Sequence, residues 1–162
     1  MNTPADHTSP ADLPAETSGS ISHSPAPASQ PGGRQPLILL VDDEVDVSLV
    51  ARTRLEVNGF AVMTAEDGEQ ALARFHERRP DLVLLDLRMP RMDGCQVCQV
   101  LKSDPDSRSV PIIMFSASSS QTLGMERKCM ELGADDYIRK PYSAEELMAK
   151  IRLHLPRPEL NR

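Results

Sequence analysis

Four of the five short apolar runs in this sequence are followed directly by a polar group suited to phosphoryl chemistry. Asp42 and Asp43 follow the first run and Asp86 follows the third. Ser116 follows the fourth run, and Lys140 follows the fifth. Short aliphatic runs of this kind predict strands that are buried on both faces of a sheet. Three carboxylates, a hydroxyl and an ammonium are therefore expected at strand ends.

These groups together favour a magnesium-dependent phosphoryl site. Three carboxylates brought close together repel one another and do not all stay ionised unaided. Mg²⁺ offsets that repulsion, because it binds a few carboxylate oxygens and keeps several waters. A carboxylate beside the ion can attack a phosphoryl group and form an aspartyl phosphate. A lysine ammonium and a hydroxyl are suited to hold the charged phosphoryl oxygens.

Each residue also has an ordinary interpretation when it is taken alone. Asp42 and Asp43 could cap the first helix, where acids interact favourably with the helix dipole. Asp86 and Lys140 could be turn residues, and Ser116 could be a loop hydroxyl. Their joint placement at strand ends, in this order along the chain, is hard to explain in that way, so we favour the phosphoryl site.

The elements that position these groups predict an α/β fold. Strand-like runs alternate with helical patterns from residue 36 onward, which indicates a five-stranded parallel sheet with helices on both faces. In such sheets the functional crevice lies at the carboxyl ends of the strands. The predicted strands are residues 37–41, 60–64, 82–85, 112–115 and 137–139.

The helices are predicted from caps and apolar spacing. We expect the first helix to begin at the cap Asp46, with Val47, Val50, Ala51 and Leu55 on its buried face. The remaining helices are expected to start at Asp67-Gly68, after Gly94, near Ser120 and after the cap Ser143, which has Glu146 at the capping-box position.

The domain organisation follows from composition. Residues 1–35 are rich in Pro, Ser and Ala, which predicts a disordered tail, with a docking segment as the alternative. Residues 36–155 are expected to form one domain. Only the short tail 156–162 follows, which leaves no room for an output domain unless the chain is a fragment of a longer protein.

Charge and apolar content exclude several classes of protein. The net charge of −6, the absence of Trp and an aromatic content of 3% argue against direct nucleic-acid binding. The apolar runs are too short to span a membrane, and the N-terminus lacks a signal-peptide pattern. We therefore expect a cytoplasmic protein without membrane insertion.

The three cysteines are expected to be reduced thiols, because an odd count without framework spacing is typical of a cytosolic protein. Cys95 and Cys98 form a C-x-x-C motif, but no second pair or nearby histidine completes a zinc site. A redox role for this pair is weighed against two ordinary semi-buried cysteines, and the latter is favoured. Cys129 is interpreted as a small apolar residue of a helix.

The sequence resembles bacterial response-regulator receiver domains over residues 36–155. The matching stretches are 39–44 (LLVDDE), 86–94 (DLRMPRMDG), 112–117 (IIMFSA) and 133–141 (GADDYIRKP). The resemblance implies a flavodoxin-like (βα)5 fold. It also implies that Asp86 is the phosphoacceptor, loaded by a histidine kinase or a histidine phosphotransfer protein.

The resemblance further implies the roles of the neighbouring residues in Mg²⁺ binding. Asp43 is expected to bind the ion directly, together with Asp86, and Asp42 to act through a bound water. Arg88 is expected to offer its backbone carbonyl as a further ligand.

A second group of residues is expected to bind the phosphoryl group and to change conformation in response. Ser116, with its hydroxyl, and Ala117 are expected to bind the phosphoryl group on activation, and Lys140 to pair first with the acids and then with a phosphoryl oxygen. Tyr137 is expected to rotate inward as the hydroxyl moves, although it could instead be an ordinary half-buried strand residue. The Lys140–Pro141 peptide bond is expected to be cis.

The sequence therefore predicts a stand-alone response regulator that signals through contacts with a downstream protein. It is not expected to act as an enzyme on other molecules and should catalyse only its own phosphorylation and dephosphorylation. Homodimerisation is a further expectation by analogy with the family. One alternative is a receiver-like scaffold that works without phosphorylation. Another is a haloacid-dehalogenase-type phosphatase, which is disfavoured because Asp86 is followed by Leu87-Arg88 rather than by a second aspartate in D-x-D.

Overall fold

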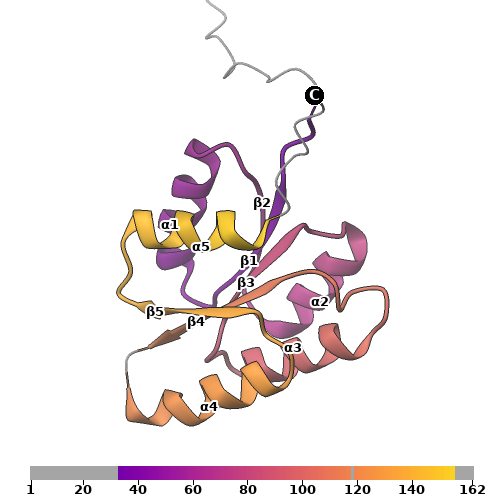
Figure 1. The fold of residues 1–162 in the computed structure, drawn as a ribbon, viewed down its shortest axis with the longest axis vertical. Coiled ribbons are helices and arrows are strands. Elements are labelled where there is room, and N and C mark those ends of the chain that lie inside the picture. The colour runs from indigo at the N-terminus through magenta and orange to yellow at the C-terminus, as the bar shows by residue number, and fades with distance from the viewer. Residues whose placement is uncertain (1–32, 118, 156–162) are drawn as a thin grey trace, which may run out of the picture. The chain divides into compact units, whose positions relative to one another are not determined.

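In the computed structural model, which describes residues 33–117 and 119–155, β-strands and α-helices alternate along the chain (Figure 1). The strands are β1 (Leu37–Val41), β2 (Ala61–Ala65), β3 (Leu82–Asp86), β4 (Ile112–Ala117) and β5 (Asp136–Lys140). The helices are α1 (Val45–Val57), α2 (Gly68–Glu77), α3 (Gly94–Ser103), α4 (Ser120–Glu131) and α5 (Ala144–His154).

The strands form one parallel sheet in the order β2-β1-β3-β4-β5. Each connection passes through a helix, which is what parallel neighbours require. β2 lies on one side of β1, whereas β3, β4 and β5 follow one another on its other side, so the direction in which strands are added reverses after β2. This reversal lies between β1 and β3, where ligands bind in sheets of this kind. The predicted α/β fold is confirmed.

Helices cover both faces of the sheet because side chains alternate along each strand. Leu39 and Leu85 pack on one side with Phe75 of α2 and Val97 of α3. Cys129 of α4 belongs to the same apolar cluster. These contacts place α2, α3 and α4 together on one face (Figure 1).

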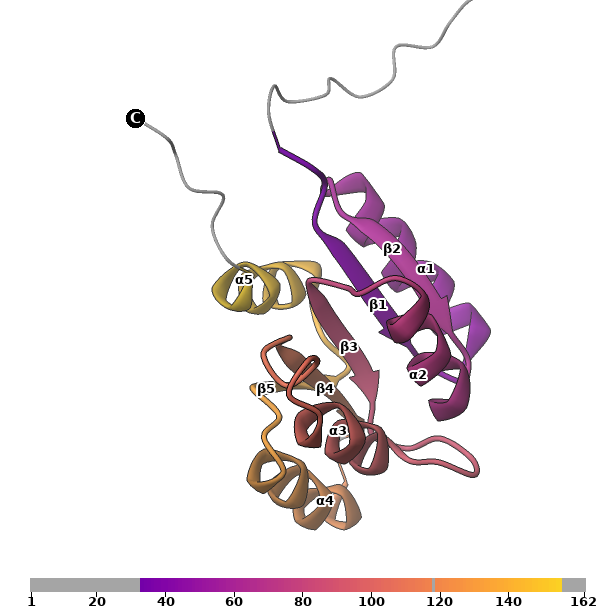
Figure 2. The same cartoon turned by 90° about the vertical axis from the view of Figure 1, so that its right-hand side faces the viewer.

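The opposite face is covered by the first and last helices. Leu40 and Phe115 point to this side and pack with Leu55 of α1 and Ile151 of α5. In Figure 2, β4 and β5 are seen between α5 and the lower pair α3 and α4. The core therefore has two apolar layers, and polar groups at strand ends lie at the edge between them.

The start of α1 differs from the prediction. The N-cap is Glu44 and not Asp46, which lies in the first turn. With this start, Ser48, Ala51 and Leu55 form the buried face, at spacings of three and four residues. Val50 was predicted to be buried, but it falls outside this stripe and is 53% exposed.

The caps of α2 and α5 agree with the sequence. Asp67 accepts a hydrogen bond from the Gln70 amide at the start of α2, and Ser143 accepts one from the Glu146 amide at α5. At α3, Asp93 and Gln96 form a reciprocal capping box. Because these caps satisfy amides that have no partner within the helix, they fix where each helix begins after the sheet.

The predicted tail 1–35 and the C-terminal residues 156–162 lie almost wholly outside the described residues. Of the tail, residues 33–35 are described, and Arg34 forms an ion pair with Asp81, with Nη2 and Oδ1 2.6 Å apart. Among residues 33–117 and 119–155, no helix combines the length and apolar character needed to cross a membrane.

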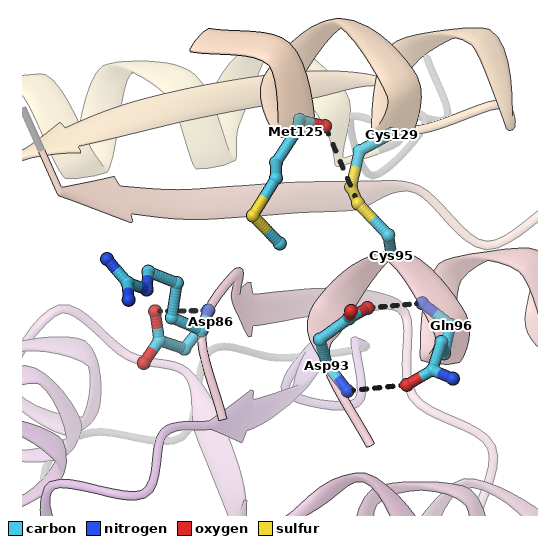
Figure 3. Close-up of a disulfide and its surroundings, with 7 residues drawn as sticks. Asp86, Asp93, Cys95, Gln96, Met125 and Cys129 are labelled. Atoms are coloured by element: carbon cyan, nitrogen blue, oxygen red, sulfur yellow. Dashed lines mark hydrogen bonds between the residues drawn. A yellow bond between two sulfur atoms is a disulfide. The ribbon is translucent and has the colours of Figure 1, made fainter. Parts of the chain in front are cut away.

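The prediction that all three cysteines are reduced is wrong for two of them. Cys95 of α3 and Cys129 of α4 form a disulfide, with Cα atoms 5.1 Å apart (Figure 3). Cys98 is a buried free thiol. Burial raises the pKa of Cys98 to about 11, which keeps it protonated. The pair escaped the sequence analysis because 34 residues separate its members and only the packing of α3 against α4 brings them together.

We expect this disulfide to stabilise the fold. A cross-link over 34 residues restricts the unfolded chain, so its reduction should lower the free energy of unfolding by about 2–4 kcal/mol. Urea unfolding with and without dithiothreitol measures this change. The variant Cys129→Ser should show the loss without reductant, whereas Cys98→Ser should respond to reductant as the parent does. An equal free energy of unfolding in both conditions would contradict the stabilising role.

Candidate functional site

Three carboxylates meet at the carboxyl ends of β1 and β3. Val41 pairs with Leu85 in the sheet, so the residues that follow them, Asp42 and Asp86, emerge at the same level. Asp43 is next in the chain. One carboxylate oxygen from each of the three aspartates lies within 4.8 Å of the other two. The adjacent strands and their register thus create the acidic cluster that the sequence predicts.

Lys140 at the end of β5 lies beside this acidic cluster. Its Nζ atom is 2.9 Å from Oδ2 of Asp42 and 3.8 Å from Oδ1 of Asp86. Burial alone lowers the pKa of Lys140, but the hydrogen bond with Asp42 and the charge of Asp86 outweigh burial and raise it. The lysine therefore stays charged and offsets part of the negative charge of the carboxylates.

Asp86 has an unusual protonation equilibrium. Its burial raises its pKa from the ordinary 3.8 to about 7. The positive charge of Lys140 and a backbone hydrogen bond from Arg88 lower the pKa, whereas the charges of Asp42 and Asp43 raise it further. Without a further cation, this carboxyl group is only partly ionised at neutral pH.

The donor set fits Mg²⁺. The three carboxylates supply hard oxygen ligands, and the exposed Asp43 leaves the site open to water, which Mg²⁺ retains in its coordination shell. A divalent cation would also favour the ionised form of Asp86. The Arg88 amide hydrogen lies toward Asp86, at an N–O distance of 3.5 Å. The ligand role of the Arg88 carbonyl stays a prediction.

Ser116 and Ala117 lie at the end of β4. Ser116 is fully buried, and its hydroxyl donates a hydrogen bond to the carboxylate of Glu126 in α4. Its hydroxyl is therefore engaged with α4 in this structure. Ala117 is exposed and pairs with Lys140 across β4 and β5, and its carbonyl accepts a hydrogen bond from Thr122 at 2.6 Å.

Glu126 is a residue of this site that the sequence analysis missed. It is only 7% exposed, and Arg139 of β5 forms an ion pair with it at an Nη2–Oε2 distance of 3.3 Å. The available signal was its spacing: Glu126 stands three residues before Cys129, on the side of the helix that faces the sheet.

Tyr137 lies on the outer part of β5 and is 36% exposed. The Arg139 guanidinium lies 5.5 Å from the ring centroid, and the Lys150 ammonium lies 5.7 Å from it. The ring is therefore held at the surface by two cations and not packed inward. The Lys140–Pro141 peptide bond is cis, in agreement with the resemblance.

The fold and the site define a class of protein that has a doubly wound parallel sheet, with an acidic cluster, a serine and a lysine at its strand ends. These groups are of the kind suited to phosphoryl chemistry. The chain belongs to the response regulator receiver domain family, whose model matches residues 38–152.

Curated relatives agree with this family. The chain is 47% identical over 120 residues to the protein named "Probable transcriptional regulator ycf27" of Guillardia theta, a match that covers 74% of this chain and 45% of the relative. It is 40% identical over 123 residues to the phosphate regulon transcriptional regulatory protein PhoB of Rhizobium meliloti, covering 75% and 53% of the two chains. The chain thus spans about half the length of these relatives.

Solved structures agree as well. The chemotaxis protein CheY4 of Vibrio cholerae superposes with a TM-score of 0.70 at 26% identity, covering 75% of this chain and all of that one. The receiver domain of NtrX from Brucella abortus gives 0.68 at 32% identity, covering 73% and 97%. The phosphatase and scaffold alternatives are not favoured by these similarities.

The raised pKa of Asp86 predicts a pH-dependent stability that Mg²⁺ changes. Because the folded state holds this proton more tightly than the unfolded chain, the stability from Asp86 is full below about pH 4 and is lost as the pH rises toward about 7. Without metal at pH 8, Asp86→Asn should therefore unfold with a free energy higher than that of the parent by a few kcal/mol.

Urea unfolding at pH 5 and pH 8, in EDTA or in Mg²⁺, measures this effect. The difference between the parent and Asp86→Asn should be smaller at pH 5, where Asp86 is protonated, and Mg²⁺ should stabilise the parent more than the variant. The same pH dependence in both proteins would contradict the raised pKa.

Proposed function

We propose that this receiver accepts a phosphoryl group on Asp86 from the phosphohistidine of a histidine kinase or a histidine phosphotransfer protein, with Mg²⁺ as cofactor. The acidic cluster of Asp42, Asp43 and Asp86 beside Lys140 is the observation that supports this proposal most strongly. Membership of the receiver family agrees with it.

The chemistry follows from the residues at the strand ends. A carboxylate oxygen of Asp86 attacks phosphorus, a new P–O bond forms, and the P–N bond to the donor histidine breaks. When bound, Mg²⁺ neutralises charge that develops on the phosphoryl oxygens. Asp42 and Asp43 would hold the ion together with Asp86, and the Arg88 carbonyl would be a further ligand. Lys140 would pair with a phosphoryl oxygen.

Phosphorylation would change the conformation of β4, β5 and α4. Ser116 would turn its hydroxyl to the phosphoryl group beside Ala117, and Tyr137 would rotate inward. Such a change alters the face formed by α4, β5 and α5, which a downstream protein would recognise. This output is a binding event, so the protein would catalyse only its own phosphorylation and dephosphorylation. Homodimerisation through the same face fits this scheme.

The domain boundaries and the location of the protein belong to the same proposal. Residues 36–155 would form the receiver, between the segments 1–35 and 156–162. A cytoplasmic location fits a histidine-kinase partner. The curated relatives are named as transcriptional regulators, but the chain matches only about half of their length, and we propose a protein contact and no direct nucleic-acid contact for this domain.

Phosphorylation by acetyl phosphate with Mg²⁺, followed by mass spectrometry of the intact protein, tests the proposal. The parent should gain one phosphoryl group, because we propose Asp86 alone as its acceptor. Asp86→Asn should gain none. Asp106→Asn, which alters an exposed acid away from the site, should gain one as the parent does. Phosphorylation of Asp86→Asn to the same extent as the parent would contradict the assignment.

A further inference from the structure

The hydroxyl of Ser116 has a partner in α4 that competes with the phosphorylation site. Both Ser116 and Glu126 are buried, with exposed fractions of 0% and 7%, and the hydroxyl donates to the Glu126 carboxylate. A serine hydroxyl carries a single proton and can donate it to one acceptor at a time. The bond to Glu126 and a bond to a phosphoryl group on Asp86 are therefore mutually exclusive.

Glu126 is itself held in place from β5. Arg139 pairs with Ser116 across β4 and β5, and its guanidinium contacts the second carboxylate oxygen of Glu126 at 3.3 Å. The same guanidinium lies over the ring of Tyr137. A buried carboxylate is costly unless hydrogen bonds and an opposite charge satisfy it. Loss of the Ser116 bond would thus disturb Glu126, Arg139 and Tyr137 together.

We propose that Glu126 is a positioning residue that holds the Ser116 hydroxyl away from Asp86 and thereby sets how readily the phosphorylated conformation forms. The proposal rests on the proposed function of Asp86. Phosphorylation supplies a competing acceptor for the hydroxyl, and the release of Glu126 transmits the event to α4. A carboxylate at this position therefore opposes activation, although it lies outside the acidic cluster.

The affinity for beryllium fluoride with Mg²⁺, which mimics a phosphoryl group on an aspartate, tests this role. Removing the competing acceptor in Glu126→Ala should tighten binding about tenfold, the ratio expected for one charge-assisted hydrogen bond. Glu126→Gln keeps an acceptor oxygen and should tighten it by less. Glu131→Ala, an exposed acid of the same helix, should bind as the parent does.

The effect must act through Ser116, and a double variant shows whether it does. In a Ser116→Ala background there is no hydroxyl to hold, so Glu126→Ala should change the affinity no further. An equal change with and without Ser116, or no change in either, would overturn the proposal, because Glu126 would then be only structural. Equal binding by the parent and Asp86→Asn would instead overturn the proposed function.

A second, independent observation concerns the disulfide between α3 and α4. Cys95 follows Gly94, which packs so closely on the Asp86 carbonyl oxygen that a β-carbon at position 94 would collide with it. Cys129 lies three residues after Glu126 in α4. The disulfide therefore ties the helix that carries Glu126 to the helix packed against the phosphoacceptor strand (Figure 3).

The surroundings suit both redox states of the pair. The Cys95 sulfur lies 3.5 Å from the Met125 carbonyl oxygen, a contact that becomes a hydrogen bond only when the sulfur carries a proton. A reduced Cys95 thus has an acceptor already in place. Disulfides in reducing compartments are usually transient or sensing. Cys98 on the same helix is a protonated, buried thiol and does not compete as a nucleophile.

We infer that the Cys95–Cys129 disulfide is a reversible redox lock on α4, so that phosphorylation shifts this helix less in the oxidised protein than in the reduced one. Closing the lock joins the two sulfurs, and two electrons and two protons pass to a low-molecular-weight disulfide such as oxidised glutathione. Its S–S bond breaks to give two thiols, and a dithiol reductant reverses the step. This inference also rests on phosphorylation at Asp86.

Hydrogen–deuterium exchange of residues 120–131, with and without beryllium fluoride and Mg²⁺, tests the lock. Adding this mimic should change the exchange rate of these amides in both redox forms. The change should be at least about threefold larger in the dithiothreitol-reduced parent than in the parent treated with oxidised glutathione. Cys95→Ser and Cys129→Ser should behave like the reduced parent in both treatments, and Cys98→Ser should respond to redox state as the parent does.

Two results would overturn the lock. One is an equal change in α4 exchange in the oxidised and reduced parent, with binding of the mimic confirmed in both. The other is the absence of the disulfide, shown by alkylation and intact mass after treatment with oxidised glutathione. Failure of the mimic to bind either form would point instead to a failure of the proposed function.

Discussion

The crowding of negative charge at the carboxyl ends of β1 and β3 is the constraint on which the rest of the site depends. The register of these strands brings Asp42, Asp43 and Asp86 together, and burial raises the pKa of Asp86 to about 7. Lys140 offsets only part of this charge. A divalent cation fits here because it permits all three carboxylates to be ionised, and an ionised Asp86 is what nucleophilic attack on phosphorus requires.

The response to a phosphoryl group depends on a different interaction, the single hydrogen bond that Ser116 can donate. In this structure Glu126 accepts it, and Arg139 links Glu126 to β5. In the proposed scheme, the phosphorylation site is coupled to α4 through competition for one proton rather than through a long chain of contacts. The disulfide acts on the same helix by a covalent restraint, so two different inputs would converge on α4.

The sequence predicted the features that depend on strand ends and local caps. The five strands along the chain, and the placement of Asp86 and Lys140 at strand ends, followed from short apolar runs, four of which are followed by a carboxylate, hydroxyl or ammonium group. Features that depend on packing between distant segments escaped it. The partner of Cys95 lies 34 residues away, and the burial of Glu126 depends on how α4 sits against β4 and β5. On α1, Ala51 and Leu55 were predicted correctly, but Ser48 rather than Val50 completes the buried face, because packing against the sheet decides which stripe of the helix is covered.

A crystal structure of the protein with Mg²⁺ and beryllium fluoride tests the central claim most directly. The account predicts beryllium bonded to a carboxylate oxygen of Asp86, the metal ion among the three aspartates, and the Ser116 hydroxyl turned from Glu126 toward a fluorine atom. Beryllium fluoride bound elsewhere, or bound at Asp86 with Ser116 still donating to Glu126, would contradict it.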